Sequence, residues 1–140
     1  MPNLTTNNIL ECFASIQGEG VHIGIPSIFI RFVKCNLSCP YCDTKYSWSE
    51  EGKYDVVDVI DYINENQEYK HVVITGGEPL LHQSDIVKIV NNFPNKVFTI
   101  ETNGTLKPSY DLARKKIESL GYNKVLEENF NGVVFWKYYK

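Results

Sequence analysis

The sequence predicts an α/β fold in which parallel strands alternate with helices. Three short runs rich in β-branched and aromatic residues lie between turn residues, at 27–33, 71–75 and 96–101, and indicate strands. The segments between them repeat apolar residues at helical spacing. This order favours parallel pairing through right-handed crossovers, so the carboxyl ends of the strands should lie at one edge of an open sheet.

The helices are expected where apolar residues recur three and four positions apart. The first covers 56–63, and the second covers 86–93 behind Ser84, the expected N-cap. A third is expected over 113–120, and Gly121 ends it. Each of the first two helices therefore connects two of the predicted strands.

Length and composition indicate a single domain over residues 1–140. A chain of 140 residues with 43% hydrophobic content can bury one core. Residues 121–140 form a tail in which Asn131 and Gly132 separate two apolar runs, as in a β-hairpin.

Charge and hydropathy argue against two classes of partner. The formal net charge is −3, and no run of lysine or arginine could follow a phosphate backbone, so nucleic acid is not expected. The N-terminus does not resemble a secretory signal, and no segment is suited to span a bilayer, so no membrane is expected. We therefore expect a cytoplasmic protein that acts on a small molecule.

Three of the four cysteines stand together, directly after the first predicted strand. Cys35, Cys39 and Cys42 are spaced C-x3-C-x2-C, so their sulfurs can converge on one centre. Three thiolates on a four-iron cubane leave one iron open to a cofactor, whereas structural zinc takes four closed ligands. The spacing favours a cluster. The alternatives are reduced thiols without metal, or a zinc site with Cys12 or a histidine as the fourth ligand. Cys12 stands apart from the other three, and such a lone cysteine is more typically a small buried hydrophobic residue than a ligand.

Two further loops are expected at the same edge of the sheet. The segment 76–79, Gly-Gly-Glu-Pro, follows the second strand, and 102–104, Thr-Asn-Gly, follows the third. Two residues without a Cβ expose backbone groups to a closely approaching ligand, for which an ammonium group is suited. Without the cysteine loop, the Gly-Gly pair would indicate only a turn.

Two polar segments suggest what the site binds. Arg31 alternates with apolar residues so that its guanidinium points inward, where it needs an anion: a substrate carboxylate, or a nearby Glu or Asp in a structural pair. The segment 15–20, Ser-Ile-Gln-Gly-Glu-Gly, offers an amide and a carboxylate suited to the edge of a heterocycle. A solvated hairpin loop would have the same composition.

In this order, the segments closely resemble those of the 7-carboxy-7-deazaguanine synthases, radical S-adenosylmethionine (SAM) enzymes of the pathway to queuosine and related deazapurines. The resemblance covers about residues 10 to 110, and the combination is far more specific than any one motif. It is carried by residues 13–20, 29–31, 35–44, 74–81 and 101–105.

The resemblance implies a partial, open parallel β/α barrel of the radical SAM type, together with a set of site residues. The implied ligands of a [4Fe-4S] cluster are Cys35, Cys39 and Cys42. The implied SAM-binding residues are Tyr41, Cys42, Asp43 and Gly77. Thr44 corresponds to a Mg²⁺ ligand. The implied substrate-binding residues are Ile16, Gln17, Gly18, Arg31 and Thr75.

The implied reaction is a lyase reaction on 6-carboxy-5,6,7,8-tetrahydropterin. The reduced cluster passes one electron to SAM, and the 5′-deoxyadenosyl radical abstracts a hydrogen from the pterin, which contracts its ring and loses ammonia to give 7-carboxy-7-deazaguanine. A one-electron reductant such as flavodoxin or ferredoxin would supply the electron. The protein's part is to place the substrate and close the site, and no side chain is assigned as a catalyst.

The sequence departs from the family after Thr105. Members of the family are longer, and their later Ser-Pro-Lys segment, which helps to bind SAM, has no counterpart here. The chain is then a minimal enzyme, a truncated and non-catalytic metal-binding module, or a half completed by a partner or a homodimer, which an open barrel edge would favour. Activating enzymes for glycyl-radical proteins share the cysteine spacing, but the 15–20 loop favours the lyase.

Overall fold

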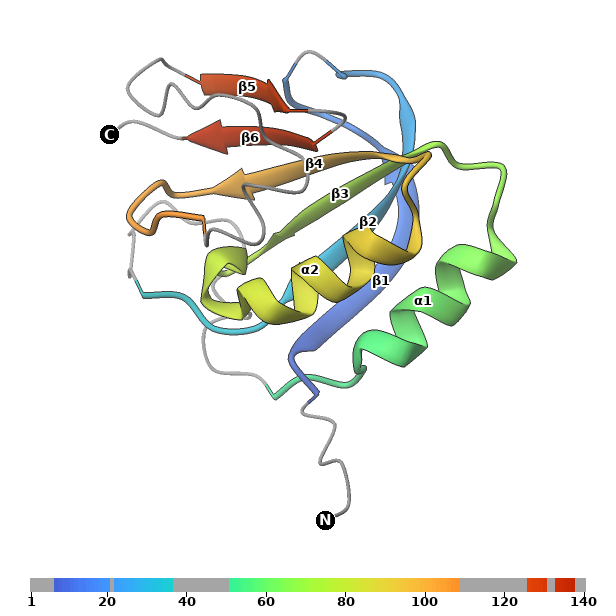
Figure 1. Cartoon of the computed structure of the whole chain (residues 1–140), viewed down its shortest axis with the longest axis horizontal. Coiled ribbons are helices and arrows are strands. Elements are labelled where there is room, and N and C mark those ends of the chain that lie inside the picture. The colour runs from blue at the N-terminus through green and yellow to red at the C-terminus, as the bar shows by residue number, and fades with distance from the viewer. Residues whose placement is uncertain (1–6, 21, 37–50, 109–125, 131–132, 138–140) are drawn as a thin grey trace.

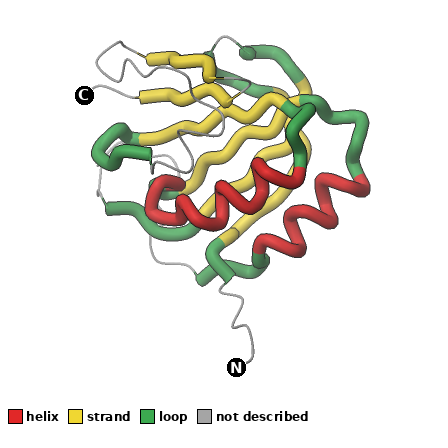
Figure 2. Tube along the Cα trace, in the orientation of Figure 1, coloured by secondary structure: helices red, strands yellow, loops and turns green. Residues whose placement is uncertain are grey.

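In the part of the chain that the structure describes, two α-helices lie on one face of an open β-sheet (Figure 1). The computed structural model describes residues 7–20, 22–36, 51–108, 126–130 and 133–137. Helices α1 (Val56–Glu65) and α2 (Gln83–Asn92) contact each other and cover the same face of the sheet (Figure 2). No helix in these ranges is long and apolar enough to cross a lipid bilayer. The helix predicted over 113–120 lies outside the described residues.

Six strands form the sheet, and their order in space differs from their order in the chain. They are β1 (Ile9–Ile16), β2 (Pro26–Phe32), β3 (His71–Gly76), β4 (Val97–Thr102), β5 (Leu126–Phe130) and β6 (Val133–Lys137). Across the sheet the order is β1-β2-β3-β4-β6-β5. The four central strands β2, β3, β4 and β6 are parallel, whereas β1 and β5 pair antiparallel at the two edges.

The predicted class, an open α/β sheet with parallel strands, is confirmed. The strands expected at 27–33, 71–75 and 96–101 are β2, β3 and β4, each within one residue at either end. The sequence did not predict the antiparallel edge at β1, which arises because β1 reaches β2 through a connection too short for a parallel crossover. Strands β5 and β6 form the antiparallel pair expected of a hairpin in the tail.

The apolar core lies between the helices and the sheet. Alternate residues of the central strands are buried against the helices: Ile28, Ile30, Phe32, Val72, Ile74, Phe98 and Ile100. The helices contribute Val59, Ile63, Ile86, Ile89 and Val90. Because successive side chains of a strand point to opposite faces, the intervening residues of β2, β3 and β4 lie on the face away from the helices.

The two helices begin in different ways. A capping box starts α1, in which the Asp58 amide donates to Asp55 Oδ1 and the Asp55 amide donates to Asp58 Oδ2, each at 2.9 Å. The prediction that Ser84 caps the second helix is wrong. The 3₁₀ helix η2 (Pro79–His82) runs directly into α2 and puts His82 at the N-cap position. The segment that follows β3 therefore determines where α2 starts.

Two histidines pack together at the amino-terminal end of β3. The ring centroids of His71 and His22 are 4.8 Å apart. His71 Nδ1 and His22 Nε2 are buried without a hydrogen-bond partner. Burial lowers the pKa of His71, and the charge of His22 lowers it further. The native protein therefore takes up a proton at His71 less readily than the unfolded chain does.

We predict that His71 makes the protein less stable as the pH falls. Above the ordinary histidine pKa of about 6.5, His71 is neutral in both the folded and the unfolded protein, so the protein keeps its full stability. Below that pH, the unfolded chain binds the proton more readily than the folded protein, which lowers the free energy of unfolding. Urea unfolding at about pH 7.5 and about pH 5.5 should show a larger loss for the wild type than for His71→Phe. Equal losses in the two proteins would contradict this assignment.

Candidate active site

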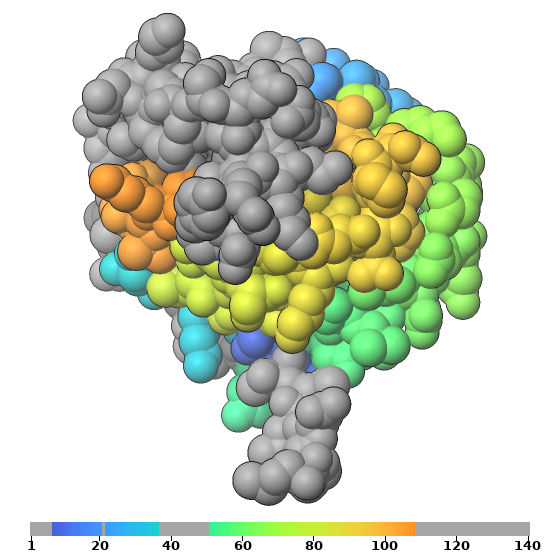
Figure 3. Space-filling view, viewed as in Figure 1, coloured from blue at the N-terminus to red at the C-terminus, as the bar shows by residue number. Residues whose placement is uncertain are grey.

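Three loops meet at the edge of the sheet where β2, β3 and β4 end, as the sequence predicts. The loop after β2 carries Cys35 and Asn36, and the loop after β4 carries Asn103 and Thr105. Asn36 Nδ2 donates to Thr105 Oγ1 at 2.8 Å. Figure 3 shows the cyan atoms of the first loop beside the orange atoms of the second. The start of the cysteine loop is thus held by a contact that is distant in sequence.

The Gly-Gly pair lies directly against the backbone of the cysteine loop. The Gly77 amide donates to the Phe32 carbonyl at 3.1 Å, and the Glu78 amide donates to the Lys34 carbonyl at 2.8 Å. A Cβ on Gly76 would overlap the Phe32 carbonyl, and a Cβ on Gly77 would overlap the Lys34 carbonyl. Gly76 also has φ +145°, which side chains rarely allow. Only glycine at both positions permits this approach.

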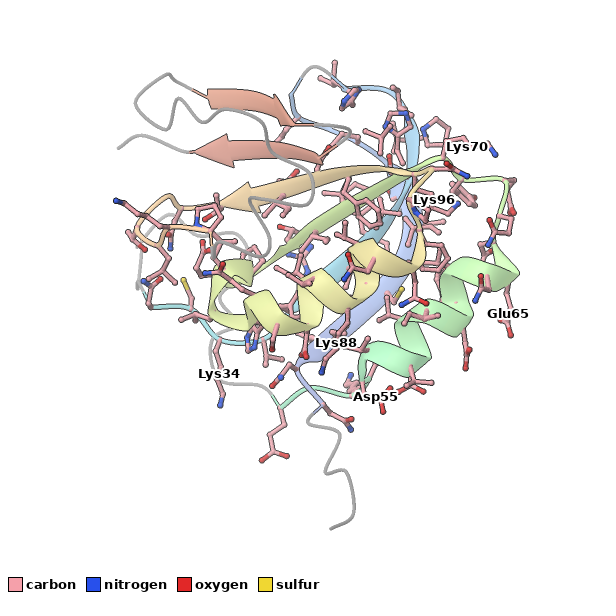
Figure 4. The ribbon with its side chains drawn as sticks, viewed as in Figure 1. Lys34, Asp55, Glu65, Lys70, Lys88 and Lys96 are labelled. Carbon is pink, nitrogen blue, oxygen red and sulfur yellow. The ribbon has the colours of Figure 1, made fainter. Side chains whose placement is uncertain are left out.

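Lys34 turns the chain into the cysteine loop. Its φ of 69° lies in the left-handed region, which is uncommon for residues other than glycine. The flanking backbone is fixed, because the Val33 amide donates to the Asn8 carbonyl at 2.9 Å and His82 Nε2 lies 2.7 Å from the Val33 carbonyl. The Lys34 side chain points away from the body of the protein (Figure 4). Contacts on both sides of Lys34 thus hold the backbone that presents Cys35.

A buried carboxylate connects the second and third loops. The Glu78 side chain is fully buried, and its oxygens accept hydrogen bonds from Thr102 Oγ1 at 2.8 and 2.9 Å. They also accept from the amides of Asn103 at 2.8 Å and Leu80 at 2.9 Å. Burial raises the pKa of Glu78, while these hydrogen bonds oppose that rise. No role was predicted for this glutamate, which fixes the loop after β4 to the loop after β3.

Three of the five predicted substrate residues, Gln17, Arg31 and Thr75, gather around Glu101 on the face away from the helices. Arg31 and Thr75 are register partners on β2 and β3, and Glu101 stands next in line on β4. Gln17 is 2% exposed, and its Nε2 donates to Glu101 Oε1 at 3.2 Å. Thr75, also buried, hydrogen-bonds to Glu101. An amide, a guanidinium, a hydroxyl and a carboxyl group thus line one polar region.

Glu101 is the residue of this region to which the sequence analysis gave no role. Burial raises its pKa, as does the charge of Glu19, whereas hydrogen bonds from Gln17 and Thr75 and the charge of Arg31 lower it. On balance the pKa is raised, so this carboxyl holds a proton at higher pH than an exposed glutamate. The period-two alternation of β4 could have identified it, because Glu101 falls on the same face as Thr99 and opposite Ile100.

Arg31 has a protein partner in this structure. Its Nε donates to Glu11 Oε2 at 2.8 Å, and the two side chains are 14% and 39% exposed. Both residues stand in register on β2 and β1. Of the two anions that the sequence left open, the carboxylate of a structural pair is therefore present.

The other predicted site residues are less informative. Ile16 is 57% exposed at the end of β1, and no atom lies near a Cβ built on Gly18. Cys12 packs against the core, and burial raises the pKa of its thiol to about 12, as expected of a buried hydrophobe.

The remaining predicted ligands lie outside the described residues: Cys39, Tyr41, Cys42, Asp43 and Thr44. Within the described ranges, no group of three histidine, cysteine or acidic side chains could hold a metal ion. The assignments made for these five residues therefore stay predictions.

A protein-family model matches a range of this chain that contains both the central strands and the cysteine loop. The model of the radical SAM superfamily matches residues 29–125, which is more than half of the chain. This chain belongs to the radical SAM superfamily. The matched range contains all three clustered cysteines and the loops after β3 and β4.

Similar proteins confirm the resemblance to the deazaguanine synthases. A 7-carboxy-7-deazaguanine synthase from Hyperthermus butylicus is 44% identical over 107 residues, covering 73% of this chain and 45% of the relative. Another from Clostridium acetobutylicum is 38% identical over 138 residues, covering 87% of this chain and 62% of the relative. The chain thus spans about half the length of the curated relatives it matches.

A solved structure extends this similarity to the fold. The crystal structure of QueE from Escherichia coli superposes with a TM-score of 0.60 at 31% sequence identity. The match covers 72% of this chain and 54% of the QueE chain. The predicted barrel type is therefore confirmed as that of the radical SAM proteins, present here as an open sheet.

We predict that Gly77→Ala destabilises the protein strongly, because the added Cβ would push the Lys34 carbonyl, and the cysteine loop with it, away from the end of β3. The expected loss is about 2 kcal/mol or more of unfolding free energy. Gly18→Ala is the matched control, since nothing lies within 4 Å of the added Cβ, and it should change the stability little. Urea unfolding measures both, and similar losses would contradict the close approach.

Proposed function

We propose that this chain acts as a 7-carboxy-7-deazaguanine synthase, converting 6-carboxy-5,6,7,8-tetrahydropterin to 7-carboxy-7-deazaguanine with loss of ammonia. The observation that carries the proposal is the polar region around Glu101, which lies beside the edge where Cys35 is presented. Its hydrogen-bonding groups suit a heterocycle that bears a carboxylate. The names of the similar proteins support the same reaction.

The donor chemistry of the site fits a [4Fe-4S] cluster and SAM. Cys35 is presented at the carboxyl edge, and neither Cys35 nor Cys12 is in a disulfide. When bound, the cluster and SAM together supply a radical that can abstract hydrogen. In this proposal Cys35, Cys39 and Cys42 hold the cluster, and Tyr41, Cys42, Asp43 and Gly77 bind SAM.

The Gly77 backbone indicates how an ammonium group would be held. Its amide already donates to the Phe32 carbonyl at 3.1 Å. The group of this residue that can accept a hydrogen bond from an ammonium is therefore its carbonyl. Replacement of Gly77 would disturb the ligand and the cysteine loop together.

The polar residues would orient the pterin rather than react with it. Arg31 would hold the substrate carboxylate through its planar guanidinium while Glu11 binds its Nε edge. Gln17 and Glu101 would read the edge of the pyrimidine ring, where a protonated Glu101 can donate as well as accept. Ile16, Gly18 and Thr75 would complete the contacts with the substrate.

Four further features belong to the proposal. Thr44 would bind a Mg²⁺ ion through oxygen, the donor that this cation prefers. A one-electron reductant such as flavodoxin or ferredoxin would reduce the cluster, and a cytoplasmic location would keep the thiolates reduced. A second copy or a partner would complete the barrel, which is supported by the edge strands β1 and β5.

One observation favours a second candidate, a metal-binding module without lyase activity. The chain spans only 45% and 62% of the relatives from Hyperthermus butylicus and Clostridium acetobutylicum. Such a module would hold the cluster but would lack part of the surface that encloses SAM and the substrate. Cluster binding alone therefore does not distinguish the candidates, whereas turnover does.

We predict that the reduced, cluster-loaded protein with SAM and Mg²⁺ converts 6-carboxytetrahydropterin to 7-carboxy-7-deazaguanine, with 5′-deoxyadenosine appearing alongside. Glu101→Gln replaces the carboxyl group that would orient the pyrimidine ring, and it should lower the rate by about tenfold or more. Glu65→Gln is the control, because Glu65 is exposed at the end of α1, far from the carboxyl edge (Figure 4). Liquid chromatography with mass spectrometry measures both products. Cleavage of SAM without deazaguanine formation would contradict the lyase assignment, whereas a bound cluster with neither product would favour the second candidate.

A further inference from the structure

Asn103 is the described side chain that connects the loop after β4 to a predicted cluster ligand. Its Nδ2 lies 4.0 Å from Cys35 Sγ and 3.0 Å from Asn36 Oδ1. A primary amide has two N–H donors, so each of these two acceptors can receive one. Asn103 thus reaches the cysteine sulfur and its neighbour at the same time.

The orientation of this amide is determined by its oxygen. Asn103 Oδ1 accepts from the Thr105 amide at 3.0 Å and from Thr105 Oγ1 at 2.8 Å. Rotating the amide by 180° would place its NH₂ group against the Thr105 amide N–H, which can only donate. The nitrogen therefore faces Cys35, and the assignment does not depend on the similar appearance of the oxygen and nitrogen atoms.

The backbone of Asn103 is fixed as firmly as its side chain. The Asn103 amide donates to the buried Glu78 carboxylate at 2.8 Å, and the preceding Thr102 hydroxyl donates to the same group. The next residue is held too, because the Gly104 amide donates to Thr102 Oγ1 at 3.2 Å. An amide held on both sides in this way can act on the sulfur with a constant geometry.

We propose that Asn103 is a positioning residue that donates an N–H···S hydrogen bond to the Cys35 thiolate and thereby raises the reduction potential of the cluster. Reduction adds one electron, and the sulfurs carry part of the added negative charge. A fixed N–H dipole stabilises that charge more in the reduced state than in the oxidised state. The inference rests on the proposed cluster but not on the lyase reaction.

The test is an EPR-monitored redox titration of the reconstituted protein, without SAM or substrate. Asn103→Leu keeps the approximate size of the side chain and removes both donors, so its midpoint should be more negative than that of the wild type. At a solution potential equal to the wild-type midpoint, its reduced fraction should then be severalfold smaller. Asn103→Asp, which is isosteric and ionised at neutral pH, should shift in the same direction.

Thr105→Val is the control for a structural effect. It removes one of the two donors to Asn103 Oδ1 and the acceptor of Asn36 Nδ2. It leaves the Asn103 N–H groups and the Thr105 backbone amide in place, and that amide still fixes the orientation of the Asn103 side chain. Its midpoint should stay close to the wild-type value. A Thr105→Val shift as large as that of Asn103→Leu would overturn the proposal, because loosening of the loop would then be the cause.

Two further outcomes are decisive. If Asn103→Leu does not retain iron, the redox midpoint of Asn103→Asp is the test instead. An unchanged midpoint in Asn103→Asp would then contradict the proposal. Loss of lyase turnover with normal midpoints would instead count against the proposed reaction alone. The two proposals can therefore fail separately.

Discussion

The close approach of two backbone segments organises the candidate site. Gly76 and Gly77 lie so near Phe32 and Lys34 that a side chain on either glycine would overlap a carbonyl oxygen. The amides of Gly77 and Glu78 bond to the carbonyls of that segment. The end of β3 and the beginning of the cysteine loop therefore form one rigid unit. A cluster ligand presented from this unit is held by backbone contacts rather than by flexible side chains.

Glu78 extends the unit to a third strand. It lies immediately after the glycines, and its buried carboxylate receives the Thr102 hydroxyl and the Asn103 amide. Burial of a carboxylate is unfavourable unless its oxygens are hydrogen-bonded, and here three donors compensate: the Thr102 hydroxyl, which both oxygens share, and the amides of Asn103 and Leu80. The Gly-Gly-Glu sequence thus combines two tasks, since the glycines admit the cysteine loop and the glutamate secures the loop after β4.

The two faces of the sheet have different roles. Helices α1 and α2 cover one face with an apolar core, which makes the strands rigid. The other face carries Arg31, Thr75 and Glu101 in neighbouring positions, with Gln17 reaching them from the end of β1. Rigid strands thus place the polar groups, and the loops at their carboxyl ends place the cysteine. The proposed cofactor region and the proposed substrate region depend on the same parallel strands.

The sequence allowed the central part of this arrangement to be predicted. Alternation, helical spacing and turn residues are local signals, and they located β2, β3, β4, α1 and α2. The predicted N-cap of α2, Ser84, was wrong. The 3₁₀ helix before α2 depends on the hydrogen bond that the Leu80 amide donates to the Glu78 carboxylate, and this contact is not visible in the spacing of residues. The pairing of Arg31 with Glu11 and the roles of Glu78, Glu101 and Asn103 could not be read from spacing, because each depends on contacts between distant strands. The functional motifs were found because the cysteine spacing and the Gly-Gly pair occur together, in an order that resembles one family.

The central claim is that three thiolates of this chain bind one four-iron cluster at the carboxyl edge of the sheet. Iron and sulfide analysis after anaerobic reconstitution tests it most directly. We expect about four irons and four sulfides per chain for the wild type and for Cys12→Ala, whose thiol packs against the core. Cys35→Ala should lose both elements. Stoichiometric zinc without iron, or a full cluster in Cys35→Ala, would contradict it.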